Sequence, residues 1–514
     1  MRIDFYKMRK IMERKTIDII KKGLDTESET IDTESETIDT ESETIDAERE
    51  TIVTERKTIV TERKGLDDIK RSNGKQKKAR CNETGKIGRY EMEQSLGKAS
   101  IRLRKPVDVI ASASVVGTKE GQGPLGALFD IVGKEDHFGA KTWEEAESNL
   151  QKEALMEAMR KADVQAEELR FLFAGDLLGQ SIASSFGLSE FGIPLFGLYG
   201  ACSTCGEALT LGALTIAGGF ADMVACVTSS HFASAEREFR FPLEYGNQRP
   251  LSASWTVTGS GAFILRRAVE ADAEGMRLQG RDIISNSEEG PKDSQKKAPG
   301  NHLEGDLEEG PKDSQKKTPG KDLEGVLEEG LMEGLEKDSE KGLGKEAGYG
   351  GKKQVRARIC GMTVGKIVDY GLKDSMNMGA CMAPAAASTL LQHFEDWKCG
   401  PESYDHIVTG DLGSVGRQAL LDILMKKGID LSEKHLDCGM LIYDAEAQDV
   451  HAGGSGCGCC AATLSAYLLK QLEEGFWKRI LFLPTGALLS KTSFNEGKTV
   501  PGICHAIVLE GIGK

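Results

Sequence analysis

A largely apolar stretch at 198–230 predicts a buried helix followed by a buried strand. Residues 207–217 contain no proline and one charge, and their apolar side chains lie on every side of a helical projection. A helix that is apolar all round belongs in a protein core. Ser203 is typical of a helix start, and the pair at 218–219, two glycines, is typical of a helix end. The short apolar run 223–227 then predicts a buried strand.

Cys202 lies at the start of this predicted helix. The helix dipole and the unpaired backbone N–H groups at such a position stabilise a thiolate and lower the pKa of a cysteine. A cysteine there can equally be a small buried side chain that fills space. The setting Gly-Ala-Cys-Ser-Thr nevertheless makes Cys202 and Ser203 candidates for a site that faces a ligand.

The same pattern of a Gly-rich turn, an apolar helix and a strand recurs at 453–486. When the glycines and phenylalanines at 219–220 and 475–476 are aligned, Gly458 falls opposite Cys202, with Cys457 beside it. Two further pairs of segments match: FLFAGDL at 171–177 with HIVTGDL at 406–412, and GAFIL at 261–265 with HAIVL at 505–509. The chain is therefore predicted to hold two copies of one unit. Two Gly-rich helix starts that face one cavity would form an anion site.

Strands and helices alternate along the chain, which predicts α/β layers. The expected strands are at 107–116, 169–174, 355–367 and 404–413, and the expected helices are at 142–162 and 382–397. Asp176 and Asp411 each follow a predicted strand, where ligands of such sheets gather. His231 follows the strand after the central helix. The alternative is that the aspartates cap turns and that the histidine only stabilises its loop.

Two segments of low complexity divide the chain into four parts. Residues 1–97 contain a seven-residue repeat, TIDTESE, with one apolar position per heptad, too few for a stable coiled coil. Residues 285–353 repeat EEGPKDSQKK after 20 residues and are rich in Gly, Pro, Lys and Glu. Both segments are expected to be disordered. The two globular halves are then expected at 98–284 and 354–514.

The composition of the chain limits the classes of function that it can have. The formal net charge of −15 argues against nucleic-acid binding by the chain as a whole. Twelve cysteines without a secretory signal fit a reducing compartment, and no apolar run reaches the length of a membrane-spanning helix. The pair Cys202 and Cys205 has the spacing of a zinc or disulfide-exchange motif. Cys205 would point one turn away into the core, so no metal site is expected.

Seven motifs, in order, resemble the stage V sporulation protein AD family of endospore-forming bacteria. They are GACST at 200–204, TSSH at 228–231, AEREFR at 235–240, TGSG at 258–261, MAPA at 382–385, TGDL at 409–412 and GGSGC at 453–457. The resemblance covers residues 98–284 and 354–512. It implies a thiolase-like fold: two pseudo-symmetric α/β halves in a layered αβαβα arrangement, in a homodimer.

The resemblance also implies a function. Members of this family bind dipicolinic acid (pyridine-2,6-dicarboxylate), largely as the calcium salt, for uptake into the developing spore and release in germination. They are soluble proteins, peripheral to the spore inner membrane, and associate there with other proteins of the same operon. Dipicolinate, alone or with calcium, is thus the expected ligand, with no cofactor and no transmembrane segment.

Cys202 matches the nucleophile of thiolase-fold acyltransferases, which also need a base and an oxyanion hole. Here Asp411 stands where a histidine is common, and the loop from Ser455 to Cys459 has no histidine or asparagine. We therefore expect a former active site reused for binding. The expected ligand-binding residues are Cys202, Ser203, Asp176, His231, Asp411, Gly454, Ser455 and Cys457. The alternative is an acyltransferase or condensing enzyme with Cys202 as its catalytic residue.

Overall fold

The computed structural model describes residues 94–239, 249–268 and 355–512, all within one compact unit, Glu93–Lys514. The low-complexity segments predicted at 1–97 and 285–353 fall almost entirely outside these residues. So do residues 240–248. The following description concerns the residues within the three ranges.

Apart from two strands of two residues each that pair with β2, five strands form the sheet of the first half. They are β2 (Ser100–Val116), β4 (Leu172–Gly175), β5 (Leu195–Gly197), β6 (Met223–Ser230) and β8 (Gly259–Arg267), in the spatial order β5-β4-β6-β8-β2. Strands β5, β4 and β6 are parallel, whereas β8 is antiparallel to both β6 and β2. Numbered by their succession in the chain, the strands lie in the order 3-2-4-5-1.

The second half repeats this order and these directions. Its strands are β9 (Ala357–Thr363), β10 (His406–Thr409), β11 (His435–Asp437), β13 (Arg479–Leu483) and β16 (Ala506–Glu510), in the order β11-β10-β13-β16-β9. Strands β11, β10 and β13 are parallel, and β16 is antiparallel to β13 and β9. The matched sequence segments fall on the equivalent strands β4 and β10, and β8 and β16. The predicted duplication is therefore confirmed.

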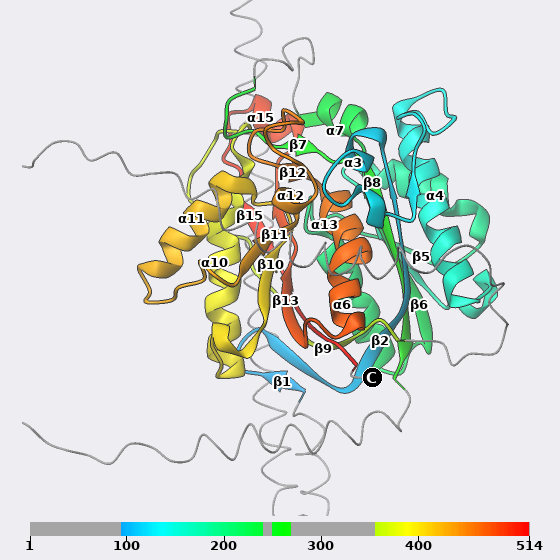
Figure 1. Ribbon diagram of the computed structural model, residues 1–514, viewed down its shortest axis with the longest axis horizontal. Coiled ribbons are helices and arrows are strands. Elements are labelled where there is room, and N and C mark those ends of the chain that lie inside the picture. Colours follow the sequence, from blue (N-terminus) through cyan, green and yellow to red (C-terminus); the bar gives the residue numbers. More distant parts are fainter. Residues whose placement is uncertain (1–93, 240–248, 269–354, 513–514) are drawn as a thin grey trace, which may run out of the picture. The chain divides into compact units, whose positions relative to one another are not determined.

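Strand β2 pairs with β9 antiparallel and joins the two halves edge to edge. Two helical segments lie in the space between the sheets: α6 (Thr204–Ala217), and α13 (Cys457–Thr463), which continues through a π-helical turn (Leu464–Leu468) into α14 (Leu469–Glu474). Helices α4 (Trp143–Ala162) and α5 (Ile182–Leu188) cover the outer face of the first half, and α10 (Met378–Trp397) and α11 (Gly413–Met425) cover that of the second (Figure 1). The fold is thus a five-layer αβαβα arrangement of thiolase-like class.

Short elements connect these layers. They are β1 (Ser95–Leu96), α3 (Thr118–Gly121), β3 (Ile131–Val132), α7 (Phe232–Phe239), β7 (Trp255–Thr256), α12 (Cys438–Leu441), β12 (Gly454–Ser455), β14 (Thr485–Ala487), α15 (Lys491–Asn495) and β15 (Gly502–Cys504). The parallel pairing of β7 with β12 matters most for the site, because it aligns Thr256 of the first half with Ser455 of the second.

The central helix begins at Thr204 and is followed by Gly218, so the sequence-based boundaries are confirmed. Thr142 caps α4 as predicted, since its side chain accepts a hydrogen bond from the Glu145 amide. The predicted start of the helix at 382 is wrong. Helix α10 begins at Met378, where the Asn377 side chain caps it, and Pro384 lies within the helix. Pro384 is buried within the helix, although an interior proline removes one helical hydrogen bond and its ring crowds the carbonyl four residues earlier.

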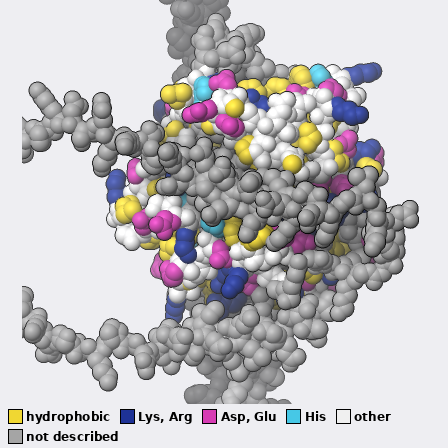
Figure 2. All heavy atoms as spheres, in the orientation of Figure 1, with side chains coloured by type: hydrophobic (Ala, Val, Ile, Leu, Met, Phe, Trp, Pro, Cys, Tyr) yellow, Lys and Arg dark blue, Asp and Glu magenta, His cyan; other side chains and the backbone are white. Residues whose placement is uncertain are grey.

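The largest core cluster lies around the two central helices and includes Cys205, Leu209, Cys460 and Leu464. Where the described atoms are visible in Figure 2, the surface mixes acidic and basic side chains with scattered apolar ones. Among the described residues, no helix is both long and apolar enough to cross a membrane.

Candidate functional site

Cys202 lies in a tight turn between β5 and α6. Ala201, directly before it, has a left-handed backbone with φ of 52°, a conformation that costs free energy in a residue with a side chain. Ser203 occupies the N-cap of α6. The turn brings the Cys202 thiol to the wall of a cavity, where the residue is 5% exposed.

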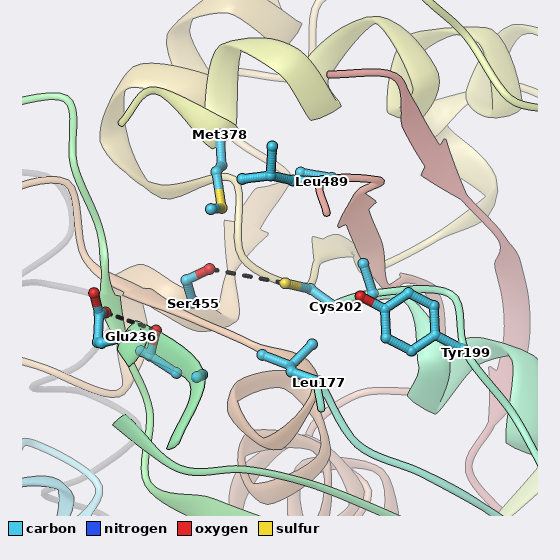
Figure 3. A pocket seen from close by; sticks show the side chains of 11 residues that line it. Leu177, Tyr199, Cys202, Glu236, Met378, Ser455 and Leu489 are labelled. Atoms are coloured by element: carbon cyan, nitrogen blue, oxygen red, sulfur yellow. Dashed lines mark hydrogen bonds between the residues drawn. The ribbon is translucent and has the colours of Figure 1, made fainter. Parts of the chain in front are cut away.

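A chain of hydrogen bonds runs from Cys202 to the second half of the molecule. The Cys202 Sγ lies 3.9 Å from the Ser455 Oγ, a distance within reach of a sulfur hydrogen bond (Figure 3). The Ser455 hydroxyl donates to the Asp411 carboxylate at 2.9 Å. Because Ser455 has a single proton and gives it to Asp411, the thiol is the donor to Ser455.

Asp411 is held by several donors at the start of α13. Its Oδ2 also accepts a hydrogen bond from the Gly456 amide at 2.9 Å, and its Oδ1 accepts one from the Thr485 hydroxyl at 2.8 Å. Burial raises the pKa of Asp411, and these hydrogen bonds oppose that shift. The Asp411 carboxylate therefore occupies the helix start at which the sequence predicts an anionic ligand.

Burial, together with the nearby Asp411 carboxylate, holds the pKa of the Cys202 thiol well above its ordinary value. The sequence-based expectation of a lowered pKa is wrong. The helix start is present, but the thiol is removed from water and faces a carboxylate rather than a base that would become positively charged. Cys202 is therefore a protonated thiol and a hydrogen-bond donor at neutral pH.

The cavity beside Cys202 is narrow, with a volume of about 20 Å³, room for about one water molecule. It is lined by Leu177, Tyr199, Ala201, Cys202, Ala235, Glu236, Thr256, Met378, Ser455, Ala487 and Leu489 (Figure 3). We call it the inner cavity. A second, outer cavity of about 420 Å³ shares Leu177, Tyr199 and Leu489 with it and is further lined by Ser181, Ser490 and Lys491. These three shared side chains stand between the two spaces.

Two predicted site residues, Cys202 and Ser455, line the inner cavity, and Asp411 lies directly behind Ser455. Gly454 pairs with Trp255 in the β7–β12 bridge. The Ser203 hydroxyl donates to the Gly200 carbonyl at 2.7 Å. The Cys457 thiol donates to the Ser229 carbonyl at 2.8 Å and does not line the cavity.

Asp176 and His231 lie away from the cavity lining. Asp176 accepts hydrogen bonds from the Leu178 amide and from the amide and hydroxyl of Ser184. The His231 ring contacts the Asp136 carbonyl oxygen at 2.8 Å and lies among aromatic side chains. Burial raises the pKa of Asp176 and lowers that of His231. Both residues therefore organise loops, which was the alternative interpretation of each.

The sequence did not single out Glu236 and Thr256 as site residues. Glu236 lies on α7 and accepts a hydrogen bond from the Thr256 hydroxyl at 2.9 Å. The AEREFR motif contains Glu236, but it does not reveal which of its two glutamates faces the cavity. Thr256 reaches the cavity only through the β7–β12 pairing, which joins distant parts of the chain.

The two cysteines with zinc-like spacing do not form a metal centre in the part of the chain that the structure describes, where no three His, Cys, Asp or Glu side chains are placed to hold a metal ion. Cys205 is buried in the core against the second half. The cysteines of this part are free thiols.

Two sheets of identical strand order around a central helical layer, with a cysteine before the first central helix, define a protein of the thiolase-like class. Within that class, the chain belongs to the stage V sporulation protein AD family, whose model matches residues 97–281 and 345–510. Stage V sporulation protein AD of Bacillus subtilis (strain 168) is 34% identical over 417 residues, which are 81% of this chain and 98% of that protein.

Solved structures with a similar fold include two enzymes of the thiolase-like class. The 3-oxoacyl-[acyl-carrier-protein] synthase III from Aquifex aeolicus VF5 is 13% identical, with 79% of this chain and 99% of that chain covered and a TM-score of 0.40. Human mitochondrial 3-ketoacyl-CoA thiolase is 12% identical, with 80% and 100% covered and a TM-score of 0.41.

Proposed function

We propose that this chain binds dipicolinic acid without transforming it, for uptake into the developing spore and release in germination. We further propose that it acts at the spore inner membrane as a peripheral partner of other proteins of its operon. Membership of the stage V sporulation protein AD family supports this role. The observation that carries the non-catalytic part is the contact of Cys202, through Ser455, with the Asp411 carboxylate.

Acyl transfer needs a thiolate, a base that takes the thiol proton and donors for an oxyanion. The pKa of the Cys202 thiol is raised by burial and by the Asp411 carboxylate. Asp411 already accepts hydrogen bonds from Ser455, Gly456 and Thr485, and its negative charge disfavours the thiolate that acyl transfer needs. These contacts favour binding over catalysis.

The inner cavity offers groups that suit a flat aromatic dicarboxylate. The Cys202 thiol and the Thr256 and Ser455 hydroxyls can form hydrogen bonds, while Leu177, Met378 and Leu489 present apolar surfaces to a ring. A cavity of about 20 Å³ is too small for such a ring. Binding therefore requires Tyr199 and Leu489 to move, which would open the inner cavity into the outer one.

The test is calorimetric titration of the protein with dipicolinate, with and without calcium, using wild type and Cys202→Ala. We expect micromolar binding by the wild type and at least tenfold weaker binding by the variant. Pyridine-3,5-dicarboxylate serves as a ligand control of equal charge and different shape. Absence of binding by folded wild type in both conditions would contradict the proposal.

The acyltransferase alternative has its own readout. Incubation with acyl-coenzyme A thioesters, followed by mass spectrometry of the intact protein and of its peptides, would reveal an acyl group on Cys202 if the chain were a condensing enzyme. We expect no acylation at neutral pH.

A further inference from the structure

The loop that follows β9 carries exposed apolar side chains. Ile367 is 61% exposed, Tyr370 is 68% exposed and Leu372 is 38% exposed. On α15, Phe494 is 47% exposed. Large apolar side chains that gather on one part of a surface indicate a contact with another molecule or with a membrane.

Hydrogen bonds join this loop to the segment that begins with α15. The Val500 amide donates to the Leu372 carbonyl at 2.7 Å. The Thr499 hydroxyl donates to the Asp369 carboxylate at 2.6 Å. The two segments therefore form one surface. We call it the loop–α15 surface, and it consists of residues 364–374 and 491–500.

The outermost charges of this surface are positive. Its exposed lysines are Lys366, Lys373, Lys491 and Lys498, and its acidic residues are Asp369, Asp374 and Glu496. Asp369 accepts a hydrogen bond from the Gly371 amide at 2.8 Å, and Asp374 accepts one from the Met376 amide at 2.9 Å. These carboxylates stay close to the backbone, whereas lysine side chains reach further out. The chain as a whole has a formal charge of −15, so a basic surface stands out on it.

The exposed apolar residues of the first half have different surroundings. Phe186 on α5 and Phe196 on β5 are exposed, and neither element contains a lysine or an arginine. Such a surface suits contact with a protein. Apolar side chains among lysines instead suit an anionic lipid surface, where the apolar groups enter the boundary and the lysines meet phosphates. Tyrosine is typical of the headgroup level.

The loop–α15 surface lies beside the cavities. Lys491, the first residue of α15, lines the outer cavity, and Phe494 belongs to the same short helix. Figure 1 shows α15 at the same end of the sheets as β7 and β12, which hold Thr256 and Ser455 of the inner cavity. A membrane against this surface would therefore lie next to the outer cavity.

We propose that the loop–α15 surface rests directly on anionic lipid, with Ile367, Tyr370 and Phe494 in the lipid boundary and the lysines at the phosphates. This inference rests on the proposed function and names the face of the protein that meets the membrane. The contact brings the outer cavity to the membrane that the ligand has to cross.

Co-sedimentation of the full chain with lipid vesicles tests the inference. One set of vesicles contains phosphatidylglycerol and phosphatidylcholine in equal amounts, and the other contains phosphatidylcholine alone. We expect wild type to bind the anionic vesicles at least about tenfold more tightly, and added salt to weaken this binding. No binding of wild type to anionic vesicles would overturn the inference and indicate a protein partner instead.

An aromatic pair of variants locates the contact. Tyr370→Ser should weaken binding to anionic vesicles by about fivefold or more, because an apolar ring is lost from the boundary. Phe220→Ser is the matched control. Phe220 is 72% exposed and lies just after α6, outside the loop–α15 surface, so this variant should bind as wild type does.

A charge pair of variants tests the lysines. Lys366→Gln combined with Lys373→Gln should weaken binding by at least about tenfold and reduce its dependence on salt. Lys426→Gln combined with Lys427→Gln removes two exposed lysines that follow α11 and should have little effect. Unchanged vesicle binding in the Tyr370 variant or in the Lys366 and Lys373 variant would overturn the inference.

Calorimetric titration with dipicolinate separates this inference from the function on which it rests. Tyr370 lines neither cavity, so Tyr370→Ser should bind dipicolinate as wild type does. Weaker vesicle binding with unchanged dipicolinate binding would support the inference. Absence of dipicolinate binding by wild type would remove the proposed function, and the vesicle results would then still decide whether this surface meets lipid.

Discussion

Among single residues, Cys202 shows two opposing effects of different size on the pKa of its thiol. A helix start stabilises an anion by about 0.3–1 kcal/mol at an exposed site, which corresponds to less than one pKa unit. Full burial shifts a pKa by as much as about 3–5 units in the opposite direction. Burial therefore prevails, and the Asp411 carboxylate adds to it. The sequence displays the helix start but not the depth of the thiol, so it could predict only the smaller effect.

Replacement of Asp411 tests this account. In Asp411→Asn the side-chain oxygen can still accept from Gly456 and the amide can donate to Thr485, but the negative charge is gone. We expect the apparent pKa of Cys202 to fall by about one unit, measured from the pH dependence of its alkylation by iodoacetamide with peptide mapping. Asp222→Asn, at a position exposed on the surface, is the matched control. An unchanged pH profile in Asp411→Asn would show that burial acts alone.

Glu147 gives a prediction for stability against pH. Burial and the nearby Asp176 raise its pKa to about 8, whereas an unfolded glutamate titrates near about 4.3. Because the folded pKa is the higher one, this contribution to the free energy of unfolding is complete below the unfolded pKa and is lost as pH rises through the folded pKa. The melting temperature should therefore fall by several degrees between about pH 5 and about pH 8.

Glu147→Gln should flatten this fall, because the glutamine oxygen can accept from the Ser229 hydroxyl, its amide can donate to the Ser234 hydroxyl oxygen, and the side chain does not ionise. The comparison is a series of thermal melts by circular dichroism across that pH range. Glu446→Gln should melt like wild type at each pH. A fall of the same size in Glu147→Gln would assign the effect to other buried carboxyls, such as those of Glu120 and Asp437.

Among the secondary-structure elements, glycines allow α13 to pack closely against the strands of the first half. A Cβ at Gly458 would overlap the Gly259 carbonyl oxygen and lie 2.7 Å from the Ser230 amide nitrogen. A Cβ at Gly261 on β8 would lie 2.6 Å from the Ala461 carbonyl carbon. The obstacles are backbone atoms, which cannot rotate away. The approach of α13 to β8 therefore depends on the absence of side chains at both positions.

Gly458→Ala should lower the free energy of unfolding by about 1–3 kcal/mol, because the added methyl group forces α13 away from β8. Gly179→Ala is the control, since a Cβ there meets no atom within 4 Å and the residue is exposed. Urea denaturation curves of both variants give the comparison. Equal midpoints for Gly458→Ala and wild type would show that the two halves can move slightly apart without a loss of stability.

The helices and strands could be predicted well from local sequence pattern, because features such as an all-apolar helix or a capping threonine depend on residues that are neighbours in the sequence. The duplication could also be predicted, since matched segments such as GDL recur at equivalent strand ends. Contacts across the halves could not. Thr256 and Ser455 meet through a two-residue pairing of β7 and β12, and nothing in the sequence near either residue specifies the other. Glu236 was missed because the AEREFR motif does not reveal which of its two glutamates faces the cavity.

For the molecule as a whole, β5 lies at one edge of the sheet among the described strands and carries exposed apolar side chains. Leu195 is 41% exposed, Phe196 is 51% exposed, and on the neighbouring α5 Phe186 is 73% exposed. Unpaired strand edges with exposed apolar residues favour pairing with another chain. We propose that a second copy of this chain covers β5, in a homodimer.

Sedimentation equilibrium should then give a mass of twice 55.7 kDa. Phe196→Glu should shift the equilibrium towards monomer by at least tenfold, because a charge would be buried at the interface. Met425→Glu changes an apolar residue that is 54% exposed on α11, in the other half, and should leave the mass unchanged. A monomeric wild type at micromolar concentration would exclude the dimer.

Strand β2 pairs with β8 of the first half on one side and with β9 of the second half on the other, and this bears on whether the two halves must belong to one polypeptide. Val107 lies opposite Arg267 on one side and opposite Ile359 on the other. Neighbouring strands are about 4.8 Å apart, so the last strand of the first half and the first strand of the second are separated by roughly 10 Å across β2. A few residues can span that gap, and the sheet itself holds the two ends in register. The two halves could therefore be encoded as separate polypeptides that assemble on β2, and the length of the segment between them is free to vary without disturbing the fold.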